Sequence, residues 1–250
     1  MMQRFTRPLN ALAQNTFTRI NLLLTLSLLG GLTGAAVLQT EWGDTCFNTT
    51  SASLIWLILY GTLFAALPFV FLQGVRELGK LRPISPSLHT GWFLALTLIL
   101  FLIPGWVTKS FDAIFIQDEI PTLAFRTTTA VYLSGLACFS SALGLAALTQ
   151  QAIELSPTAA SFLQHYFALR RSLSSFVLLI GGVIGLGTLT TGGLQNALQT
   201  HDASAAFPPE VTVVYGAYFS LTLSVLSLPT AWMLLVKGNA YLDQHLPLHS

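Results

Sequence analysis

The sequence predicts an all-α fold, a polytopic membrane bundle of six transmembrane helices with both termini on the cytoplasmic side. Three observations carry this prediction. Of the 250 residues, 53% are hydrophobic and only 8% are Asp, Glu, Lys or Arg, whereas soluble domains average about 25% charged residues. Six uncharged apolar runs approach or exceed the roughly 20 residues that cross a bilayer. Basic residues gather in alternate connections between these runs. The whole chain, 1–250, is therefore expected to form one transmembrane domain.

The six runs lack charged residues and His in their central portions. Basic residues precede the first run, as in a cleaved signal peptide, but the run exceeds the roughly 7–15-residue core of such peptides, so an uncleaved anchor is expected. An interfacial helix is expected before it, at about 7–18, because Leu9, Leu12 and Phe17 share one face. The spans are expected at about 20–38, 54–74, 91–107, 128–149, 173–194 and 211–236.

The distribution of charge predicts the orientation, because Lys and Arg are retained on the cytoplasmic side of membrane proteins. With the N-terminus inside, nine of the eleven basic residues face the cytoplasm, and only Lys109 and Arg126 lie outside. Seven of the ten acidic residues then fall outside. Both termini are therefore expected in the cytoplasm, and the inner (plasma) membrane of a bacterium is the expected location.

Glycine is concentrated in the fifth run, LLIGGVIGLGTLTTGG at 178–193. Helices in lipid associate by close backbone approach, which small side chains permit. The spacing small-xxx-small occurs at Gly181 and Gly185 and again at Gly30 and Gly34, and we expect the fifth span to be the central packing helix. A stripe of small residues in the fourth span consists of Ser134, Cys138, Ser141 and Gly144. The expected helix-packing residues are Gly30, Gly31, Gly34, Gly181, Gly182, Gly185 and Gly187.

The segment SPTAASFLQHYFALRR precedes the fifth span and predicts a helix along the cytoplasmic surface or an extension of the fifth helix. Ser156 is its expected N-cap, and Pro157 suits the first turn. Two arginines would lie at the depth of the phospholipid headgroups. The candidate contacts with a cytoplasmic partner or with lipid are Phe162, His165, Tyr166, Arg170 and Arg171.

Acidic residues dominate the opposite side of the membrane. A ring of carboxylates around a mouth would concentrate cations, although ordinary solvated loops with a positive-inside bias show the same pattern. Tyr215 and Tyr218 are expected at the depth of the membrane–water interface. Prolines near the ends of spans bend helices and free a carbonyl one turn earlier; they are Pro68, Pro104 and Pro229. The residues of the candidate outer mouth are Asp112, Asp118, Glu119 and Glu210.

The sequence contains no recognisable catalytic set. It has no His-Glu-x-x-His or Cys-x-x-Cys motif, and its five histidines lie outside the spans without ligand spacing. No ionisable residue lies inside a span, as proton- or ion-coupled transporters usually require. Cys46 and Cys138 are expected at different membrane depths, so no disulfide is predicted. We expect no enzyme activity, no cofactor and no metal, and the net charge of +1 gives no basis for nucleic-acid binding.

The function expected from these features is that of a non-enzymatic integral membrane subunit. It would assemble through its Gly-rich helices, as a homo-oligomer or with a membrane or cytoplasmic protein partner, into a pore, a channel-like or a membrane-effector complex in the lipid bilayer. One alternative is a compact single-chain transporter or channel for a small neutral solute, lined by hydroxyl groups such as those of Thr188, Thr190 and Thr191. Another is a membrane sensor or anchor that binds a partner at 162–171.

Overall fold

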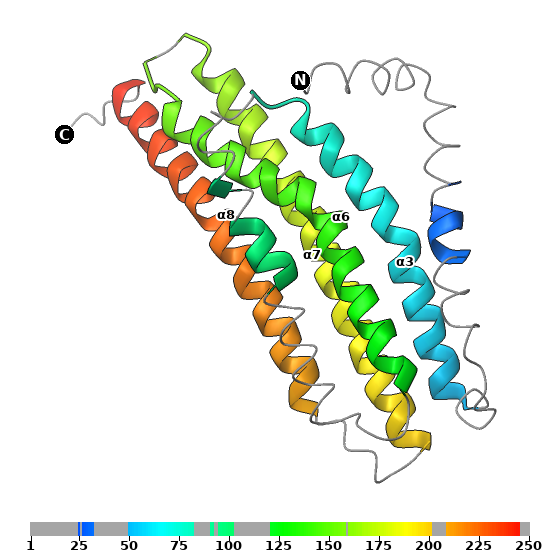
Figure 1. The fold of residues 1–250 in the computed structure, drawn as a ribbon. Helices are drawn as coiled ribbons and strands as arrows, with labels where there is room; N and C mark the ends of the chain where they lie inside the picture. Colours follow the sequence, from blue (N-terminus) through cyan, green and yellow to red (C-terminus); the bar gives the residue numbers. More distant parts are fainter. Residues whose placement is uncertain are drawn as a thin grey trace.

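Long α-helices make up most of the described chain in the computed structural model (Figure 1). It describes residues 25, 27–32, 50–82, 91–92, 95–102, 121–158, 160–201 and 209–245. No strand occurs in these ranges. The elements are α3 (Ser51–Leu78), the π-helix η2 (Leu98–Leu102), α6 (Pro121–Glu154), α7 (Phe162–His201) and α8 (Pro209–His245).

Within these ranges, four helices are long and apolar enough to cross a membrane: α3, α6, α7 and α8. They have 28, 34, 40 and 37 residues. At 1.5 Å per residue each exceeds the roughly 30 Å of a hydrocarbon core. They contain the expected spans 54–74, 128–149, 173–194 and 211–236, and helix formation there is confirmed.

The other two expected spans are only partly described. Residues 27–32 of the first are helical, and the third contains η2. The six-span count and the orientation of the termini therefore stay predictions. The expected interfacial helix at about 7–18 lies outside the described residues.

Two helix starts show how local sequence sets the boundaries. Thr50 caps α3, where its side chain accepts a hydrogen bond from the Ser53 backbone N–H at 3.1 Å. The expected cap at Ser156 is wrong, because α7 begins at Phe162 and continues as one helix through the glycine-rich segment. The Ser156 hydroxyl instead lies 2.9 Å from that of Thr158 in the preceding turn. The segment before the fifth span is thus an extension of the fifth helix.

Two helices, α6 and α7, each contact the other three long helices, and α6 also contacts η2 (Figure 1). The more deeply buried of the two is α6, since 67% of the residues in its most apolar stretch are buried, against 22% in α7. The expectation that the glycine-rich helix is the central packing helix stays a prediction, because α7 shares this position with α6. Small residues of α6 lie against several neighbours, whereas Gly182, Gly185 and Gly187 of α7 have no described atom within 4 Å of an added Cβ.

Relative helix directions follow from contacts between distant residues. The Ser140 hydroxyl donates to the Phe71 carbonyl at 3.3 Å, and the Gln151 amide donates to the Arg82 carbonyl at 3.3 Å. Residue numbers rise together in these pairs, so α3 and α6 run in the same direction. By contrast α7 and α8 are antiparallel, because Gly192 faces Thr212 whereas Gly181 faces Leu223.

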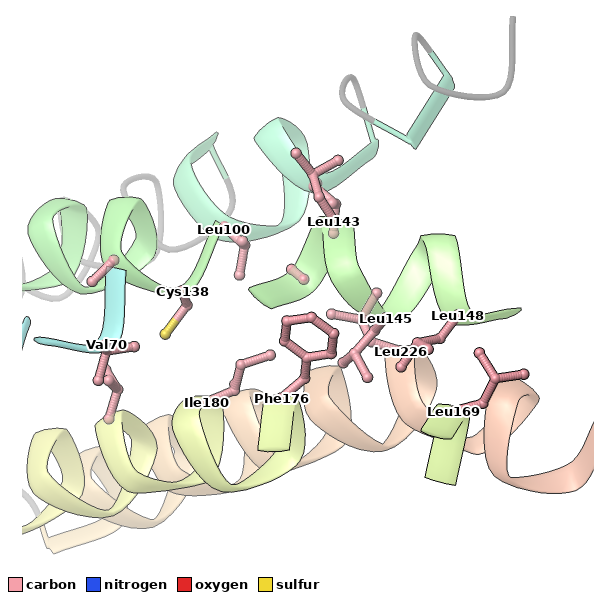
Figure 2. Packing of buried hydrophobic residues seen from close by; sticks show 14 of the residues in the cluster. Val70, Leu100, Cys138, Leu143, Leu145, Leu148, Leu169, Phe176, Ile180 and Leu226 are labelled. Atoms are coloured by element: carbon pink, nitrogen blue, oxygen red, sulfur yellow. The ribbon is translucent and has the colours of Figure 1, made fainter. Parts of the chain in front are cut away.

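One hydrophobic cluster follows α6 along its length. Figure 2 shows the Phe176 ring of α7 directed toward α6 near Leu145, and both side chains are fully buried. A second cluster joins α3 to the end of α7. On α3, Trp56, Tyr60 and Phe64 recur every four residues; Tyr60 stacks on Phe64, and Trp56 packs on Tyr60 in a tilted arrangement. Large apolar side chains on the other faces remain exposed, as expected for helices in contact with lipid.

Gly144 should be intolerant of even a methyl group. A Cβ there would lie 2.6 Å from two ring carbons of Phe176. We expect Gly144→Ala to lower the free energy of unfolding by about 1–3 kcal/mol, since the buried ring has to move. Unfolding by SDS in mixed micelles measures the change. Gly61→Ala is the matched control because no atom lies within 4 Å of a Cβ at that position. Equal effects of the two changes would contradict the packing described here.

Candidate functional site

The candidate site is an exposed face of α7 that is built around glycine, and we call it the glycine face. Gly182 and Gly185 are exposed, and a Cβ added to either would have no atom within 4 Å. Leu178 and Leu189, exposed by 74% and 58%, lie one turn before and one turn after them. These four residues recur every three or four positions, so they line one side of the helix. The result is an exposed apolar face that carries no side chain between two leucines.

The other predicted packing glycines differ in what they contact. Gly30 packs directly on α3, where an added Cβ would clash with the Phe64 carbonyl and the Pro68 ring. Gly31 and Gly181 make ordinary contacts, at 3.7 Å to Ala65 and 3.8 Å to Leu223. Gly187 has nothing within 4 Å, and Gly34 lies outside the described residues.

Buried glycines that the sequence analysis did not select make closer contacts. A Cβ on Gly74 would lie 2.6 Å from the Ser141 hydroxyl, at the contact of α3 with α6. Together with Gly144 this position fixes the distance of α6 from its neighbours. Neither belongs to a glycine pair, so the small-xxx-small pattern gave no signal for Gly74. Gly144 was noted as one member of the α6 stripe of small residues.

The predicted contact residues at 162–171 divide into two groups. Phe162 is buried, 1% exposed, and stacks on Tyr241 with ring centroids 4.6 Å apart. Tyr166 packs against Gly238, so both side chains join α7 to α8. His165, Arg170 and Arg171 lie at the surface, as expected for contact with lipid or a partner.

Sequence reasoning missed two exposed apolar residues beside these arginines. Leu163 and Phe167 are 46% and 59% exposed. They lie on one side of α7 with Arg170 and Arg171, at the spacing of successive turns. This pattern was readable in the sequence, but Phe162 and Tyr166 formed an equally regular alternative.

Polar contacts inside the bundle are few and join specific helices. The Thr149 and Thr230 hydroxyls lie 2.7 Å apart and connect α6 to α8, with Thr230 fully buried. The Tyr218 hydroxyl of α8 donates to the Ile99 carbonyl of η2 at 2.7 Å. Each contact satisfies a polar group in a place that lipid cannot.

One ion pair occurs among the described residues, at the end of α3. Glu77 is buried near the end of α3, and its carboxylate lies 2.5 Å from the Lys80 ammonium. Within the described ranges, no group of three His, Cys, Asp or Glu residues is arranged to hold a metal ion. Of the candidate outer mouth, Glu210 lies in the first turn of α8, and Asp112, Asp118 and Glu119 lie outside the described residues.

The geometry thus defines a class of protein. Four helices of this length and apolar character are consistent with an integral, multi-pass membrane protein that contacts the lipid bilayer. No protein-family model matches the sequence, and no curated protein or solved structure matches it either.

The Thr149–Thr230 contact should stabilise the bundle measurably. Thr230→Val keeps the shape and removes the hydroxyl that reaches α6. We expect a loss of about 0.6 kcal/mol, and at most about 1.7 kcal/mol, the values typical of hydroxyl contacts between membrane helices. SDS unfolding measures it. Thr62→Val is the control, since that hydroxyl bonds only to Ile58 of its own helix, at 2.7 Å. A larger loss at Thr62 would overturn this assignment.

Proposed function

We propose that the chain is a non-enzymatic integral membrane subunit that assembles through the glycine face of α7 into a pore, a channel-like or a membrane-effector complex. The observation that carries the proposal is the open space over Gly182 and Gly185. Two glycines at helix contacts each admit a neighbour, since Gly144 admits Phe176 and Gly30 admits the α3 backbone. On the glycine face no described neighbour uses the space, which leaves it free for a helix of another chain.

Physical chemistry in lipid favours this use of the face. Apolar surface alone does not drive helices together, because lipid tails are as apolar as leucine. Two helices gain dispersion contacts when their backbones approach closely, which glycine permits. A second copy of α7 presents the same glycine face between Leu178 and Leu189. A self-complementary, two-fold contact between two copies is therefore the simplest assembly.

The proposed topology has six spans with both termini in the cytoplasm. Parallel α3 and α6 support it, because a chain that crosses the bilayer in both must return between them. The expected third span, 91–107, is the apolar segment available for that return. Two of its residues support this position, since Leu96 and Leu100 are buried in the cluster along α6. In this arrangement nine of the eleven basic residues lie on the same side of the membrane as the termini. This excess supports a cytoplasmic location of both termini.

The assembly is tested by the oligomeric state in lipid nanodiscs, measured by mass photometry or native mass spectrometry. Wild-type chain should occur as an oligomer. The double variant Gly182→Leu/Gly185→Leu should dissociate, with an affinity at least about tenfold weaker, which corresponds to about 1.4 kcal/mol of lost contact.

Gly61→Leu is the matched control for this experiment. Gly61 lies on α3, and it also has nothing within 4 Å of an added Cβ. It should assemble like the wild type. A wild-type particle with the mass of one chain would refute the proposal, and so would equal dissociation of both variants.

The exposed cytoplasmic side of α7 favours a second candidate function, a membrane anchor or sensor. About 11 residues of α7 precede the expected span at 173–194, a length of about 16 Å. Arg170 and Arg171 therefore lie within about 5 Å of the hydrocarbon edge, at the depth of phospholipid phosphates. No ion pair engages either arginine among the described residues. Their charges are free to bind anionic headgroups.

This candidate predicts loss of bound anionic lipid from Arg170→Gln/Arg171→Gln. Each basic residue near an anionic surface contributes about 1 kcal/mol, so retention of phosphatidylglycerol should fall about fivefold per charge removed. Native mass spectrometry of the protein released from mixed phosphatidylcholine–phosphatidylglycerol nanodiscs counts the lipids. Arg82→Gln, an exposed basic residue beyond the end of α3, is the control. Unchanged lipid retention in the double variant would exclude the anchor.

A further inference from the structure

The glycine face is the middle of a longer exposed stripe that follows one side of α7. Three large apolar side chains mark it, because Phe167, Leu178 and Leu189 are 59%, 74% and 58% exposed. Each of them follows the one before by 11 residues, which is about three turns of an α-helix. The other members of the stripe recur at the same interval. The exposed residues of this α7 stripe are Leu163, Phe167, Arg171, Ser174, Leu178, Gly182, Gly185 and Leu189.

The 11-residue interval determines how a second helix can follow the stripe. Helices that share a surface of this period wind around each other in a right-handed sense and stay in contact along its length. Between the large side chains, the stripe carries Ser174, Gly182 and Gly185. Small side chains at these positions let the backbone of a second helix approach closely. The pattern therefore favours contact along the whole stripe over contact at a single point.

The cytoplasmic end of the stripe lies beyond the reach of lipid. The expected span begins at residue 173, so Phe167 and Leu163 lie about 9 and 15 Å outside the hydrocarbon core, whereas a headgroup layer is only roughly 5–7 Å thick. Leu163 is 46% exposed, and Phe167 is exposed still further. A second copy in the same membrane orientation presents the same two side chains at the same height. It is therefore the occupant that covers the stripe both inside and outside the lipid.

Assembly along the stripe brings like charges together. In a two-fold pair each residue on the stripe meets the same residue of the other copy. Arg171 lies on the stripe 11 residues before Gly182, and Arg170 lies beside it. Neither arginine makes an ion pair among the described residues. Because like charges at short range repel each other, paired α7 helices need an anion between their arginines.

Phospholipid phosphates supply that anion, since they lie at the depth of these arginines and guanidinium groups bind phosphate oxygens through paired N–H donors. We propose that two copies, paired through the glycine face, together form a binding site for the phosphate of an anionic phospholipid, with Arg170 and Arg171 of each copy as its ligands. The site rests on the proposed assembly and deepens it, because one copy alone holds only half of the ligands. The membrane anchor differs, since there a single copy binds the lipid.

The test is the dependence of pairing on lipid charge. Chains labelled at the C-terminus with donor or acceptor fluorophores are reconstituted in vesicles of phosphatidylcholine, with and without phosphatidylglycerol, and energy transfer is followed on dilution with lipid. We expect the wild type to pair about fivefold more tightly with phosphatidylglycerol, the effect of one basic residue at an anionic surface. Arg170→Gln/Arg171→Gln should pair equally in both vesicles, because it lacks the groups that bind the headgroup.

Arg76→Gln/Arg82→Gln is the matched control. It removes two exposed basic residues at the end of α3 and should keep the full effect of phosphatidylglycerol. Loss of the effect in this control would show a general response to surface charge and would overturn the site. An effect that persists in Arg170→Gln/Arg171→Gln would overturn it as well.

Two further outcomes separate the site from the assembly and from free phosphate. Equal pairing of the wild type in both vesicles overturns the lipid site and leaves the assembly intact, whereas absence of energy transfer in both refutes the assembly and the site together. Inorganic phosphate added to phosphatidylcholine vesicles should not replace phosphatidylglycerol. If it does, the arginines bind free phosphate and the assignment to a lipid headgroup is wrong.

Discussion

The described bundle depends on the small side chains of α6, which let neighbouring helices approach its backbone closely. Helices in lipid gain little from apolar burial, so they hold together where atoms of neighbouring helices touch at short range. On α6, Gly144 lets the Phe176 ring of α7 lie against the backbone, and the small Ser140 and Ser141 side chains bring α3 close at Gly74. Thr149 adds the hydroxyl contact with α8. A larger side chain at any of these positions separates α6 from a partner, and only α7, among the described helices, likewise contacts the three other long helices.

Hydropathy predicted where the helices lie in the sequence better than it predicted which helices contact one another. The spans expected at 54–74, 128–149, 173–194 and 211–236 all lie inside long helices, because apolar length is a property of each segment alone. Which segment is central depends on contacts between segments. The paired glycines of α7 are conspicuous, whereas the small residues of α6 are mostly Ser and Ala with one glycine, Gly144. Composition therefore drew attention to α7 and not to α6, which is the more deeply buried helix.

The candidate site shows the same division. Exposure of Arg170 and Arg171 was predictable from charge, and it is observed. Burial of Phe162 was not predictable, because its partner Tyr241 lies on another helix. Tyr218 was expected at the membrane–water interface, as is common for tyrosine. Its hydrogen bond to Ile99 could be found only when the fold placed α8 beside η2.

The glycines of the chain can be separated by what their missing side chains allow. Gly30, Gly74 and Gly144 lack a Cβ where a neighbouring atom needs the space, so their cost in helix propensity is offset inside the chain. Gly182 and Gly185 gain no such contact from the described residues. Each costs about 1 kcal/mol relative to alanine in an aqueous helix. Among the described residues, no contact at the glycine face offsets that cost. Contact with a second helix would offset it, and this difference between the two sets of glycines is the physical argument for assembly through α7.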